Sequence, residues 1–535
     1  MREALLCPGA NGIPQRRLPI PTEIELKLAV QAADLPALKR TLIEMAPDRV
    51  SARKRLLSTY YDTPDRALQR RGLILRIREQ GGRFIQTVKA GDLMGPDILA
   101  RGEWEDAVDE NRPNPHAPES GAQLPDGATS DLRPLFVTDI TRTAVGIEPE
   151  PATQIEVAID EGEIRGIGGR EVEPISEVEL ELKGGEPAMI YDLAARLLDV
   201  APMRIGMRAK SDRGYQLVDG ADAAPRAVHA EPVSLDPTIS VGDALQAIGR
   251  GCLRQLLRNE AAALSAQPEG IHQMRIAVRR LRSALSSFKK MLPAEDLAWI
   301  TGELKWLMSA LAEARNLDAF GTDLLEPTRD ALHDEPGFDD LAAAVDRLRR
   351  AAYERVREVI LSERYTALML HLLHWFEARS WRGRSPFDGS DSASQPIGEV
   401  TPLLLDRRRR KMRQRSKHFG RLNSRKRHKL RIAGKKLRYA IELLESLFNQ
   451  QDLQKFTKRL KRLQDDLGHA NDVSVAHDFL RRLCRNAQFD SPVANAGARL
   501  LEWHERAMAK GERKLRKRLR RLNHAKPFWR ARPPR

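Results

Sequence analysis

The segment Glu23-Ile24-Glu25-Leu26-Lys27-Leu28 alternates charged and apolar residues. Successive side chains of a β-strand point to opposite faces, so this alternation predicts a strand with one charged and one apolar face. The pattern recurs over residues 73–78, 154–160 and 176–183. Glycine-containing turns separate these segments, and helical patterns are few, at about 33–45 and 186–198. We therefore expect an antiparallel β domain with a couple of helices over residues 20–218, after a flexible leader at 1–19.

The charged faces of these strands carry both signs, in rows. Acidic rows are formed by Glu23 with Glu25, by Glu103 with Glu105, and by Glu177 with Glu179 and Glu181, and basic rows by Arg76 with Arg78 and by Arg208 with Lys210. Burying such a sheet without water would be costly. We expect instead a β tunnel whose apolar faces point outward and whose charged faces surround a ligand. Carboxylates suit Mg²⁺ or Mn²⁺, and Arg and Lys suit phosphoryl oxygens, so the implied ligand is a metal–polyphosphate complex. A solvated outer face is the alternative for any single row.

The second half of the chain has a different texture. Past Pro237, Ala, Leu, Arg and Glu recur at helical spacing over residues 242–265, 269–291, 295–325, 338–378 and 425–447. We expect an all-α region over 238–525, preceded by a linker at 219–237 and followed by a basic tail at 526–535. Residues 379–401 are rich in Ser, Gly, Pro and Asp, and we expect them to form a loop.

The helical half contains an internal repeat. Residues 272–282 (HQMRIAVRRLR) align with residues 428–438 (HKLRIAGKKLR) at an offset of 156, and residues 311–314 match 467–470 at the same offset. Two matches at one offset predict a duplicated helical unit, with repeat 1 at about 238–378 and repeat 2 at about 402–520. Each copy is expected to form a bundle of about four helices.

Each repeat carries a basic helix face. The residues that share it, at steps of three or four, are His272, Arg275, Arg279 and Arg282 in the first copy, and His428, Arg431, Lys435 and Arg438 in the second. Cations stacked in this way repel one another. A solvated surface would explain one such face, but its recurrence in register favours a groove for a polyanion. Aromatic residues are 5% of the chain and do not interleave with the basic rows, so a nucleic-acid partner is disfavoured.

Composition limits the class of protein. The 535 residues carry a net charge of +16, yet residues 1–220 hold 29 basic and 36 acidic residues, so an acidic half precedes a strongly basic one. Cys7, Cys252 and Cys484 lie far apart, which argues against a disulfide scaffold or a zinc ribbon. The sequence has no apolar run long enough to span a membrane, and its N-terminus has no apolar stretch typical of a signal peptide. We expect a cytoplasmic protein.

Six elements of the first half, taken together, resemble the CYTH or triphosphate tunnel metalloenzyme superfamily. They are Glu23-x-Glu25-x-Lys27, Tyr60-Tyr61-Asp62-Thr63, Leu73-x-x-Arg76-x-Arg78, Gln86-Thr87-Val88-Lys89, Arg101-x-Glu103-Trp104-Glu105 and Lys210-x-x-Arg213-Gly214-Tyr215. The resemblance implies an α+β multidomain protein that begins with an antiparallel eight-stranded β tunnel barrel. It also implies that divalent metal and triphosphate bind inside this tunnel and that the triphosphate is hydrolysed there.

The resemblance also implies roles for individual residues. Catalysis is expected from Glu23, Glu25 and Lys27. The expected metal ligands are the carboxylates of Glu23, Glu25, Glu103, Glu105, Asp160, Glu177, Glu179 and Glu181. Which two of the last three contact metal stays open. The residues expected to hold phosphate are Lys27, Arg76, Arg78, Lys89, Arg101, Arg142, Lys210 and Arg213.

Residues 238–520 resemble the CHAD domain, a helical domain associated with inorganic polyphosphate. The resemblance includes residues 315–318 (RNLD) and 465–472 (DDLGHAND) beside the repeated basic helices. It implies that the basic faces bind polyphosphate and that the protein could associate with polyphosphate granules. His272 and His428 lie among Arg and Lys side chains, which disfavour a further cation. They are therefore better suited to phosphate contact or helix packing than to binding metal.

The expected activity is therefore metal-dependent hydrolysis of inorganic triphosphate, in which a metal-oriented water attacks the terminal phosphorus. No GxxxxGK[ST] loop is present, so a P-loop NTPase is excluded. Three alternatives stay open: a CYTH enzyme that acts on thiamine triphosphate, one that cyclises ATP, and a non-enzymatic polyphosphate-binding scaffold. The sequence indicates neither the oligomeric state nor any coupling between the two halves.

Overall fold

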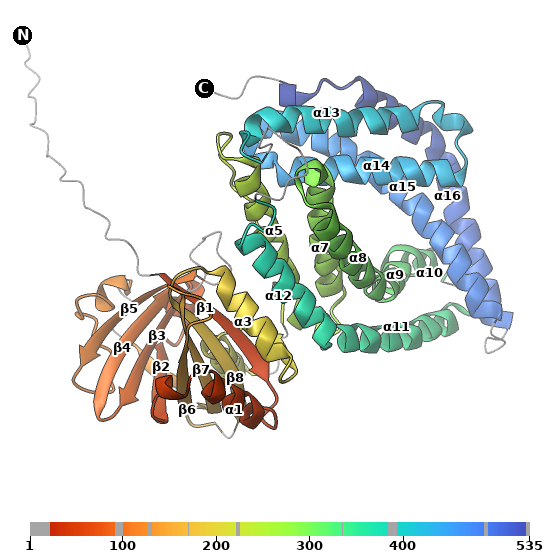
Figure 1. Cartoon of the computed structure of the whole chain (residues 1–535). Coiled ribbons are helices and arrows are strands. Elements are labelled where there is room, and N and C mark those ends of the chain that lie inside the picture. Colours follow the sequence, from red (N-terminus) through yellow and green to blue (C-terminus); the bar gives the residue numbers. More distant parts are fainter. Residues whose placement is uncertain are drawn as a thin grey trace, which may run out of the picture.

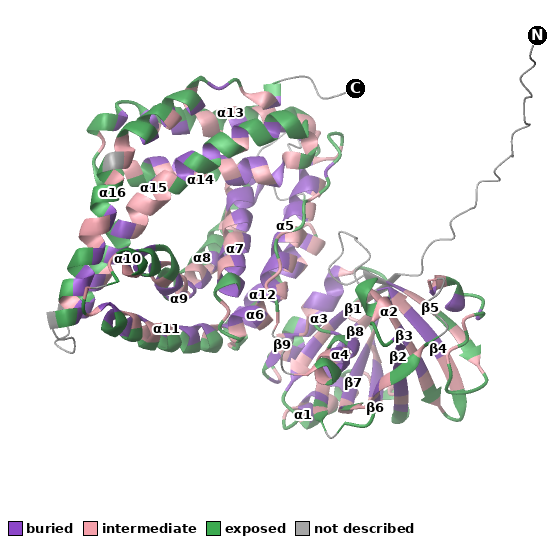
Figure 2. Ribbon diagram, turned by 180° about the vertical axis from the view of Figure 1, so that it is seen from behind, coloured by how far each residue is buried: buried purple, intermediate pink, exposed green. Residues whose placement is uncertain are grey.

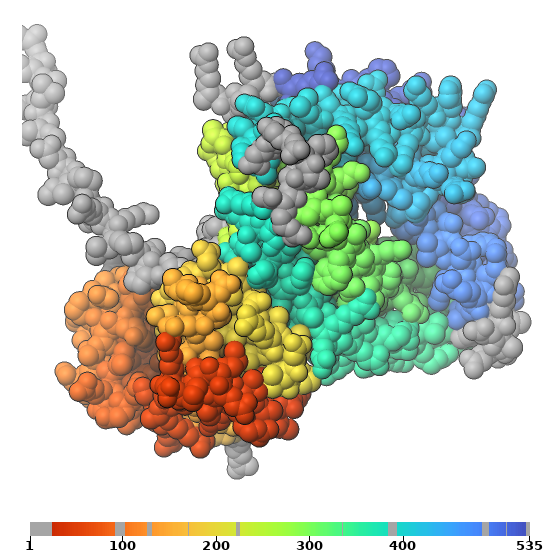
Figure 3. All heavy atoms as spheres, in the orientation of Figure 1, coloured from red at the N-terminus to blue at the C-terminus, as the bar shows by residue number. Residues whose placement is uncertain are grey.

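The computed structural model describes residues 22–90, 100–125, 131–169, 171–220, 225–333, 335–382, 393–485 and 491–530. The side chains of residues 22, 23, 100, 101, 484, 485, 491 and 510 are not part of this description. The predicted leader at 1–19 lies outside the described residues. Within them the chain forms a β domain followed by a larger helical domain, which lie side by side in Figures 1 and 3.

Nine antiparallel strands form the sheet of the first domain. They are β1 (Thr22–Val30), β2 (Lys54–Asp62), β3 (Leu73–Gln80), β4 (Arg83–Ala90), β5 (Ala100–Val108), β6 (Arg133–Ile147), β7 (Gln154–Gly166), β8 (Val172–Gly184) and β9 (Met203–Ile205). Their order is β5-β4-β3-β2-β6-β7-β8-β1-β9, and β5 also pairs with β1 through Thr22 opposite Gly102. Eight strands therefore close on themselves, and β9 is a short addition to β1. The eight-stranded tunnel expected from the sequence is confirmed.

The period-two pattern sorts the two faces of this sheet as predicted. Leu26 and Leu28 of β1, and Val178 and Leu180 of β8, are buried on the outside of the tunnel. They share one apolar core with helix α1 (Leu35–Met45) and helix α3 (Ala188–Leu198), which cover this face in Figure 1. The intervening residues of the same strands are charged and point inward. Because side chains alternate along a strand, burial of the apolar residues directs the charged residues between them into the tunnel.

The helical domain begins after a linker that has neither helix nor strand over residues 225–237. Its helices are α5 (Val241–Arg258), α6 (Glu260–Leu264), α7 (Pro268–Phe288), α8 (Ala294–Ala310), α9 (Ala312–Ala319), α10 (Glu326–Ala331), α11 (Phe338–Ile360), α12 (Glu363–Glu377), α13 (Ile397–Ser416), α14 (Ser424–Leu443), α15 (Gln450–Arg485) and α16 (Ser491–His524). Helices α2 (Ala67–Arg70) and α4 (Lys210–Asp219) belong to the β domain. No helix in the described part of the chain has both the length and the apolar character to cross a bilayer.

The two halves of the helical domain repeat each other in structure. Helices α13, α14 and α15 begin 156 residues after α5, α7 and α8, respectively. Ser240 and Pro396, which are also 156 residues apart, face each other in an antiparallel bridge. Helices α7 and α14 contact each other directly. An antiparallel contact between equivalent residues indicates a pseudo-twofold axis at this bridge.

Two expectations need correction. The loop predicted over 379–401 ends early, since α13 starts at Ile397. Lys210 lies at the start of helix α4 and not on a strand with Arg208. The helical pattern over 338–378 forms two helices, and Ser362 caps the second by accepting a hydrogen bond from the Tyr365 amide.

The two domains are held together by a buried interface. Helix α3 of the β domain packs against α12 of the helical domain, and one apolar core runs through both. Figure 2 shows buried residues on both sides of this junction. The buried hydroxyl of Thr366 on α12 donates a 2.8 Å hydrogen bond to the carbonyl of Met203 on β9. Burial of apolar surface between α3 and α12 stabilises this contact between the domains.

Candidate functional site

The tunnel of the β domain encloses a polar cavity of about 310 Å³. Its lining comes from all eight strands of the closed sheet and from the start of α4. The charged residues that line it are Glu25, Lys27, Arg76, Arg78, Lys89, Glu103, Glu105, Arg142, Glu156, Glu179, Glu181, Lys183 and Lys210. Eleven residues of the predicted site are therefore brought together in one cavity, although they are spread over 186 positions of the chain.

Three buried carboxylates form one acidic group, of which Glu179 lines the cavity. Asp160 on β7 lies opposite Glu177 on β8, and oxygens of Asp160, Glu177 and Glu179 are within 4.8 Å of one another. The Lys210 ammonium lies 2.8 Å from Asp160 Oδ2 and 2.7 Å from Glu179 Oε1, and it also contacts Glu177. Arg142 forms an ion pair with Asp160 at 2.6 Å and contacts Glu179. The carboxylates are therefore close enough to share a cation, and in this structure side-chain cations neutralise them.

This charge balance shifts the pKa values of the groups in it. Burial would raise the pKa of Glu179, but Lys210, Lys27 and Arg142 together hold it well below its ordinary value. Burial likewise opposes the charge of Lys210, yet Glu179 and Asp160 raise the pKa of this lysine above its ordinary value. Glu179 is therefore ionised, and Lys210 protonated, across the physiological pH range.

A second acidic row crosses the three neighbouring strands. Glu25 on β1 lies opposite Glu181 on β8, which in turn lies opposite Glu156 on β7. Like charges placed directly opposite each other on neighbouring strands are destabilising. The sequence analysis missed Glu156, although it precedes Asp160 by four residues and so shares its strand face. The row adds a second place where a cation would be favoured.

The opposite wall is rich in cations. Arg76 and Arg78 come from β3 and Lys89 from β4, while Glu103 on β5 lies 3.2 Å from Arg76 and 2.9 Å from Lys89. The Nε atoms of Arg76 and Arg78 are buried without a hydrogen-bond partner among the described residues. Arg76 and burial lower the pKa of Arg78 to about 10. A buried donor without a partner is costly, so this wall favours a bound anion.

Helix α4 places Lys210 at the cavity because it can approach the sheet closely. A side chain at Gly214 would come within 2.1 Å of the Phe136 ring on β6, so glycine is required there. The buried Asp62 carboxylate accepts hydrogen bonds from Tyr215 Oη at 2.9 Å and from the amides of Thr63 and Leu68. The motif residues Tyr215 and Asp62 thus fix α4 against the strands.

Three predicted site residues lie elsewhere or stay undescribed. Arg213 pairs with Glu173 at 2.7 Å and approaches Glu177 at 3.5 Å, but it does not line the cavity. The backbones of Glu23 and Arg101 pair with each other between β1 and β5. The side chains of these two residues lie outside the described ones, so their roles stay predictions.

In the helical domain, four of the predicted basic residues converge where α7 meets α14. Arg279 on α7 acts electrostatically on both Arg431 and Lys435 of α14. Arg275 is 8% exposed, donates to the Met308 carbonyl at 2.8 Å, and has a buried Nε without a partner among the described residues. Burial, followed by Arg431 and Arg279, lowers the pKa of Lys435 to about 7. Arg275, Arg279, Arg431 and Lys435 are here called the α7–α14 cluster. Asp472 lies 3.9 Å from Arg431 and also acts on Lys435, so the cations of the cluster outnumber this carboxylate.

The remaining predicted residues of the two basic faces diverge from this cluster. His272 accepts a hydrogen bond from Arg315 Nε at 3.1 Å, and His428 contacts Asn471 at 2.9 Å, where Asn471 is the repeat equivalent of Arg315. Arg438 pairs with Glu442 at 3.2 Å. Arg282 is close enough to Lys436 to lower the pKa of that lysine, together with burial and the cations of α13. Arg315 belongs to the segment 315–318 quoted in the sequence analysis, although no site role was predicted for it.

Comparisons with known proteins agree with this division of the chain. Residues 21–215 match the CYTH domain and residues 247–481 match the CHAD domain. An inorganic triphosphatase of Haemophilus influenzae is 33% identical over 204 residues, which are 36% of this chain and 54% of that protein. An uncharacterised protein of Mycobacterium tuberculosis is 26% identical over 246 residues, 45% of this chain and 44% of that protein. The matches therefore span about half the length of these relatives.

One solved structure illustrates the second match. The CHAD domain of the plant Ricinus communis is 28% identical, with a TM-score of 0.48, and the alignment covers 57% of this chain and 98% of that one.

Proposed function

We propose that this chain, which consists of a CYTH domain followed by a CHAD domain, is a divalent-metal-dependent hydrolase of inorganic triphosphate. One observation carries the proposal: the tunnel opposes an acidic wall to a basic wall in which buried guanidinium nitrogens have no partner among the described residues. A triphosphate with its metal supplies a group of opposite charge to each wall at once. The similarity to an inorganic triphosphatase supports the same substrate class.

The residues on the acidic wall fit a hard divalent cation. Carboxylate oxygens are the ligands that Mg²⁺ and Mn²⁺ prefer. The groups that would hold the metal are the triad of Asp160, Glu177 and Glu179 and the row of Glu25, Glu156 and Glu181. When bound, such a metal would neutralise phosphate oxygens and lower the pKa of a coordinated water. Glu23 is a further candidate, on the sequence pattern alone.

The chain's own residues bind and orient the substrate. Arg76, Arg78 and Lys89 would donate hydrogen bonds to phosphate oxygens on the basic wall, since guanidinium groups match phosphate in geometry. Lys27 and Lys210 both contact Glu179 on the acidic wall, and they would exchange carboxylate contacts for phosphate contacts when substrate enters. Because these groups are held by the closed sheet, little reorganisation is needed in the transition state, which is the main source of catalysis in such sites.

The test is phosphate release by the full-length chain from inorganic triphosphate, thiamine triphosphate and ATP, with Mg²⁺ or Mn²⁺. Inorganic triphosphate should give the highest kcat/KM. Arg76→Gln should lower kcat/KM by about 100-fold, whereas the matched variant Arg83→Gln, at an exposed position on the neighbouring strand, should retain it. Cyclic AMP as the product from ATP, or preferred turnover of thiamine triphosphate, would replace the proposed substrate.

We further propose that the CHAD domain binds inorganic polyphosphate through the α7–α14 cluster. Support comes from its four cations, drawn from both repeats, and from the Nε atoms of Arg275 and Arg431, which are buried without partners among the described residues. Such binding would also retain the enzyme where polyphosphate accumulates, including at granules in the cytoplasm. Long-chain polyphosphate would act as a ligand there and triphosphate as the substrate of the tunnel.

Alanine at all four positions of the α7–α14 cluster should abolish retention on polyphosphate without changing triphosphate turnover. Lys289→Ala combined with Lys290→Ala, at two exposed cations just after α7, is the matched control. Equal retention of the cluster variant and the control would refute this binding site. The four-alanine variant and the unmodified chain are also compared on DNA at the same salt concentration. If the variant loses retention on DNA as well, the cluster is a general polyanion site instead.

A further inference from the structure

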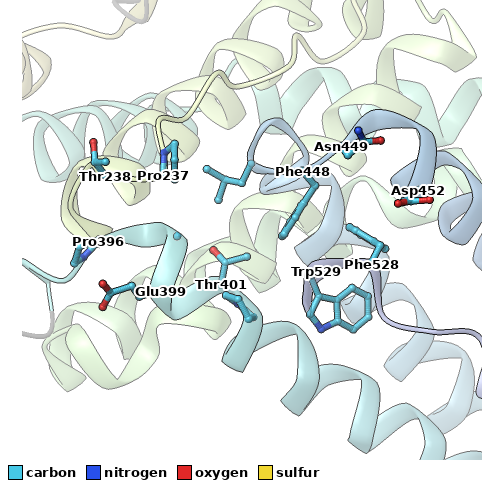
Figure 4. Close-up of a pocket in the computed structure, with 13 residues that line it drawn as sticks. Pro237, Thr238, Pro396, Glu399, Thr401, Phe448, Asn449, Asp452, Phe528 and Trp529 are labelled. Atoms are coloured by element: carbon cyan, nitrogen blue, oxygen red, sulfur yellow. The ribbon is translucent and has the colours of Figure 1, made fainter. Parts of the chain in front are cut away.

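A second cavity lies in the helical domain. It measures about 450 Å³, a size typical of small-molecule sites. Its lining includes the rings of Phe448, Phe528 and Trp529 (Figure 4). The indole N–H of Trp529 donates to Asp406 at 3.0 Å, so its ring rather than its polar atom is left for an occupant. The cavity therefore offers flat apolar surfaces, which suit an aromatic group.

Two carboxylates give this cavity its charge. Glu399 and Asp452 line it at opposite ends in Figure 4, both are exposed, and no described Lys or Arg lines it. Lys455, one turn along α15, lies 3.6 Å from Asp452. Carboxylates beside aromatic rings, in a half of the chain that is strongly basic, favour a cationic occupant.

Three residues of the cavity have equivalents in the first repeat. At the repeat offset of 156, they are Gly398 with Gly242, Glu399 with Asp243, and Asp452 with Asp296. The backbone supports this alignment, because the amide of Gly398 donates to the Pro237 carbonyl. The amide of Gly242 donates in the same way to the carbonyl of Ala393, which is 156 residues after Pro237.

Aromatic and cationic side chains contact these three positions in the first repeat. The buried Trp381 lies beside the glycine, and Arg379 forms a 2.6 Å ion pair with Asp243. Trp375 donates from its indole N–H to Asp296 at 3.0 Å, and its ring packs against that of Trp381 with centroids 4.7 Å apart. The first repeat therefore fills this place with indole rings and one guanidinium group.

We propose that the cavity of the second repeat binds a small aromatic cation, in the place that residues 375–381 fill in the first. The ring of the ligand would stack on the three aromatic rings of the cavity, and its ammonium or guanidinium group would pair with Glu399 or Asp452. The ring faces would add to this attraction, because they also favour a cation. The α7–α14 cluster is proposed to bind an anion, so the two sites would take ligands of opposite charge.

Calorimetric titration of the full chain with tryptamine, which joins an indole ring to an ammonium group, tests this ligand class. Indole-3-propionate, which carries the same ring on a carboxylate, is the control. Tryptamine should bind about 10-fold more tightly, since the carboxylates of the cavity attract one ligand and repel the other. Equal affinity for the two compounds, or no binding of tryptamine, would overturn the proposal.

A pair of double variants locates the binding. Glu399→Gln combined with Asp452→Asn should weaken tryptamine binding by about 10-fold, because two partly exposed ion pairs can no longer form. Asp340→Asn combined with Glu354→Gln, at exposed positions on α11, is the matched control and should leave the affinity unchanged. An equal loss in both variants would overturn the proposal. Tryptamine binding that appears only in a chain ending at Arg530 would also overturn it, because the cavity would then belong to the chain's own C-terminal residues.

Discussion

Replacing Lys435 by arginine should remove the pH dependence of polyphosphate binding between pH 7.5 and 9. Burial and the neighbouring Arg431 and Arg279 lower the pKa of Lys435 to about 7, so the unliganded protein holds this side chain largely neutral at pH 9. A bound polyphosphate would reverse the sign of the local potential and raise the pKa of the lysine. Binding is then coupled to proton uptake, and affinity falls as the pH rises.

The size of the effect follows from the two pKa values. If bound phosphate returns Lys435 to an ordinary lysine pKa near 10.4, the dissociation constant should rise by about 20-fold between pH 7.5 and 9. Burial and Arg315 lower the pKa of His272, so this imidazole is already neutral in that range and does not contribute. Arginine stays protonated throughout, so Lys435→Arg should bind with nearly constant affinity.

The assay is a titration of the full chain with long-chain polyphosphate at fixed ionic strength, repeated at each pH by calorimetry in two buffers of different ionisation enthalpy. The wild type should take up close to one proton per site at pH 8.5, and Lys435→Arg should take up none. Equal pH dependence of the two proteins would refute the assignment of Lys435 to the polyphosphate site.

Three further predictions concern the tunnel and the domain interface. Asp160→Asn should lower kcat for inorganic triphosphate by about 100-fold at saturating metal, while Asp139→Asn, on the outer face of the sheet, should not. Thr366→Val removes the hydrogen bond to β9 and should cost about 1–2 kcal/mol of unfolding free energy, unlike the helix-surface control Thr457→Val, as measured in urea. The lowered pKa of Glu179 contributes stability at neutral pH that is lost as the pH falls below about 4, so Glu179→Gln should show a shallower fall in unfolding midpoint toward pH 2.

The tunnel could be predicted because period-two alternation fixes the face of each side chain in a strand. Knowing that Glu25, Arg76 and Glu179 share inner faces required only the strand positions. Lys210 was placed on a strand because Arg208 and Lys210 alternate like the true strands. In the structure the Asp212 carboxylate accepts a hydrogen bond from the Ala209 amide and starts a helix there. A short alternation cannot be distinguished from a helix cap by its pattern alone.

The helical domain shows where periodicity stops being informative. The repeated motif predicted the equivalence of Arg275 with Arg431 and of Arg279 with Lys435, because that equivalence depends on sequence offset alone. It did not indicate that Arg438 turns to Glu442, since the direction of a side chain at the edge of a helix face depends on which helix crosses there. The repeated motif likewise did not predict that α12 packs on β9 through Thr366, because contacts between domains leave no periodic pattern in the sequence.

The most direct test of the account is release of phosphate from inorganic triphosphate by the purified full-length chain, measured with and without Mg²⁺ or Mn²⁺. The account predicts turnover that depends on added divalent metal and that falls by about 100-fold in Arg76→Gln. No turnover with either metal, or turnover that is unchanged in this variant, would contradict the claim that the charged interior of the tunnel is a triphosphatase site.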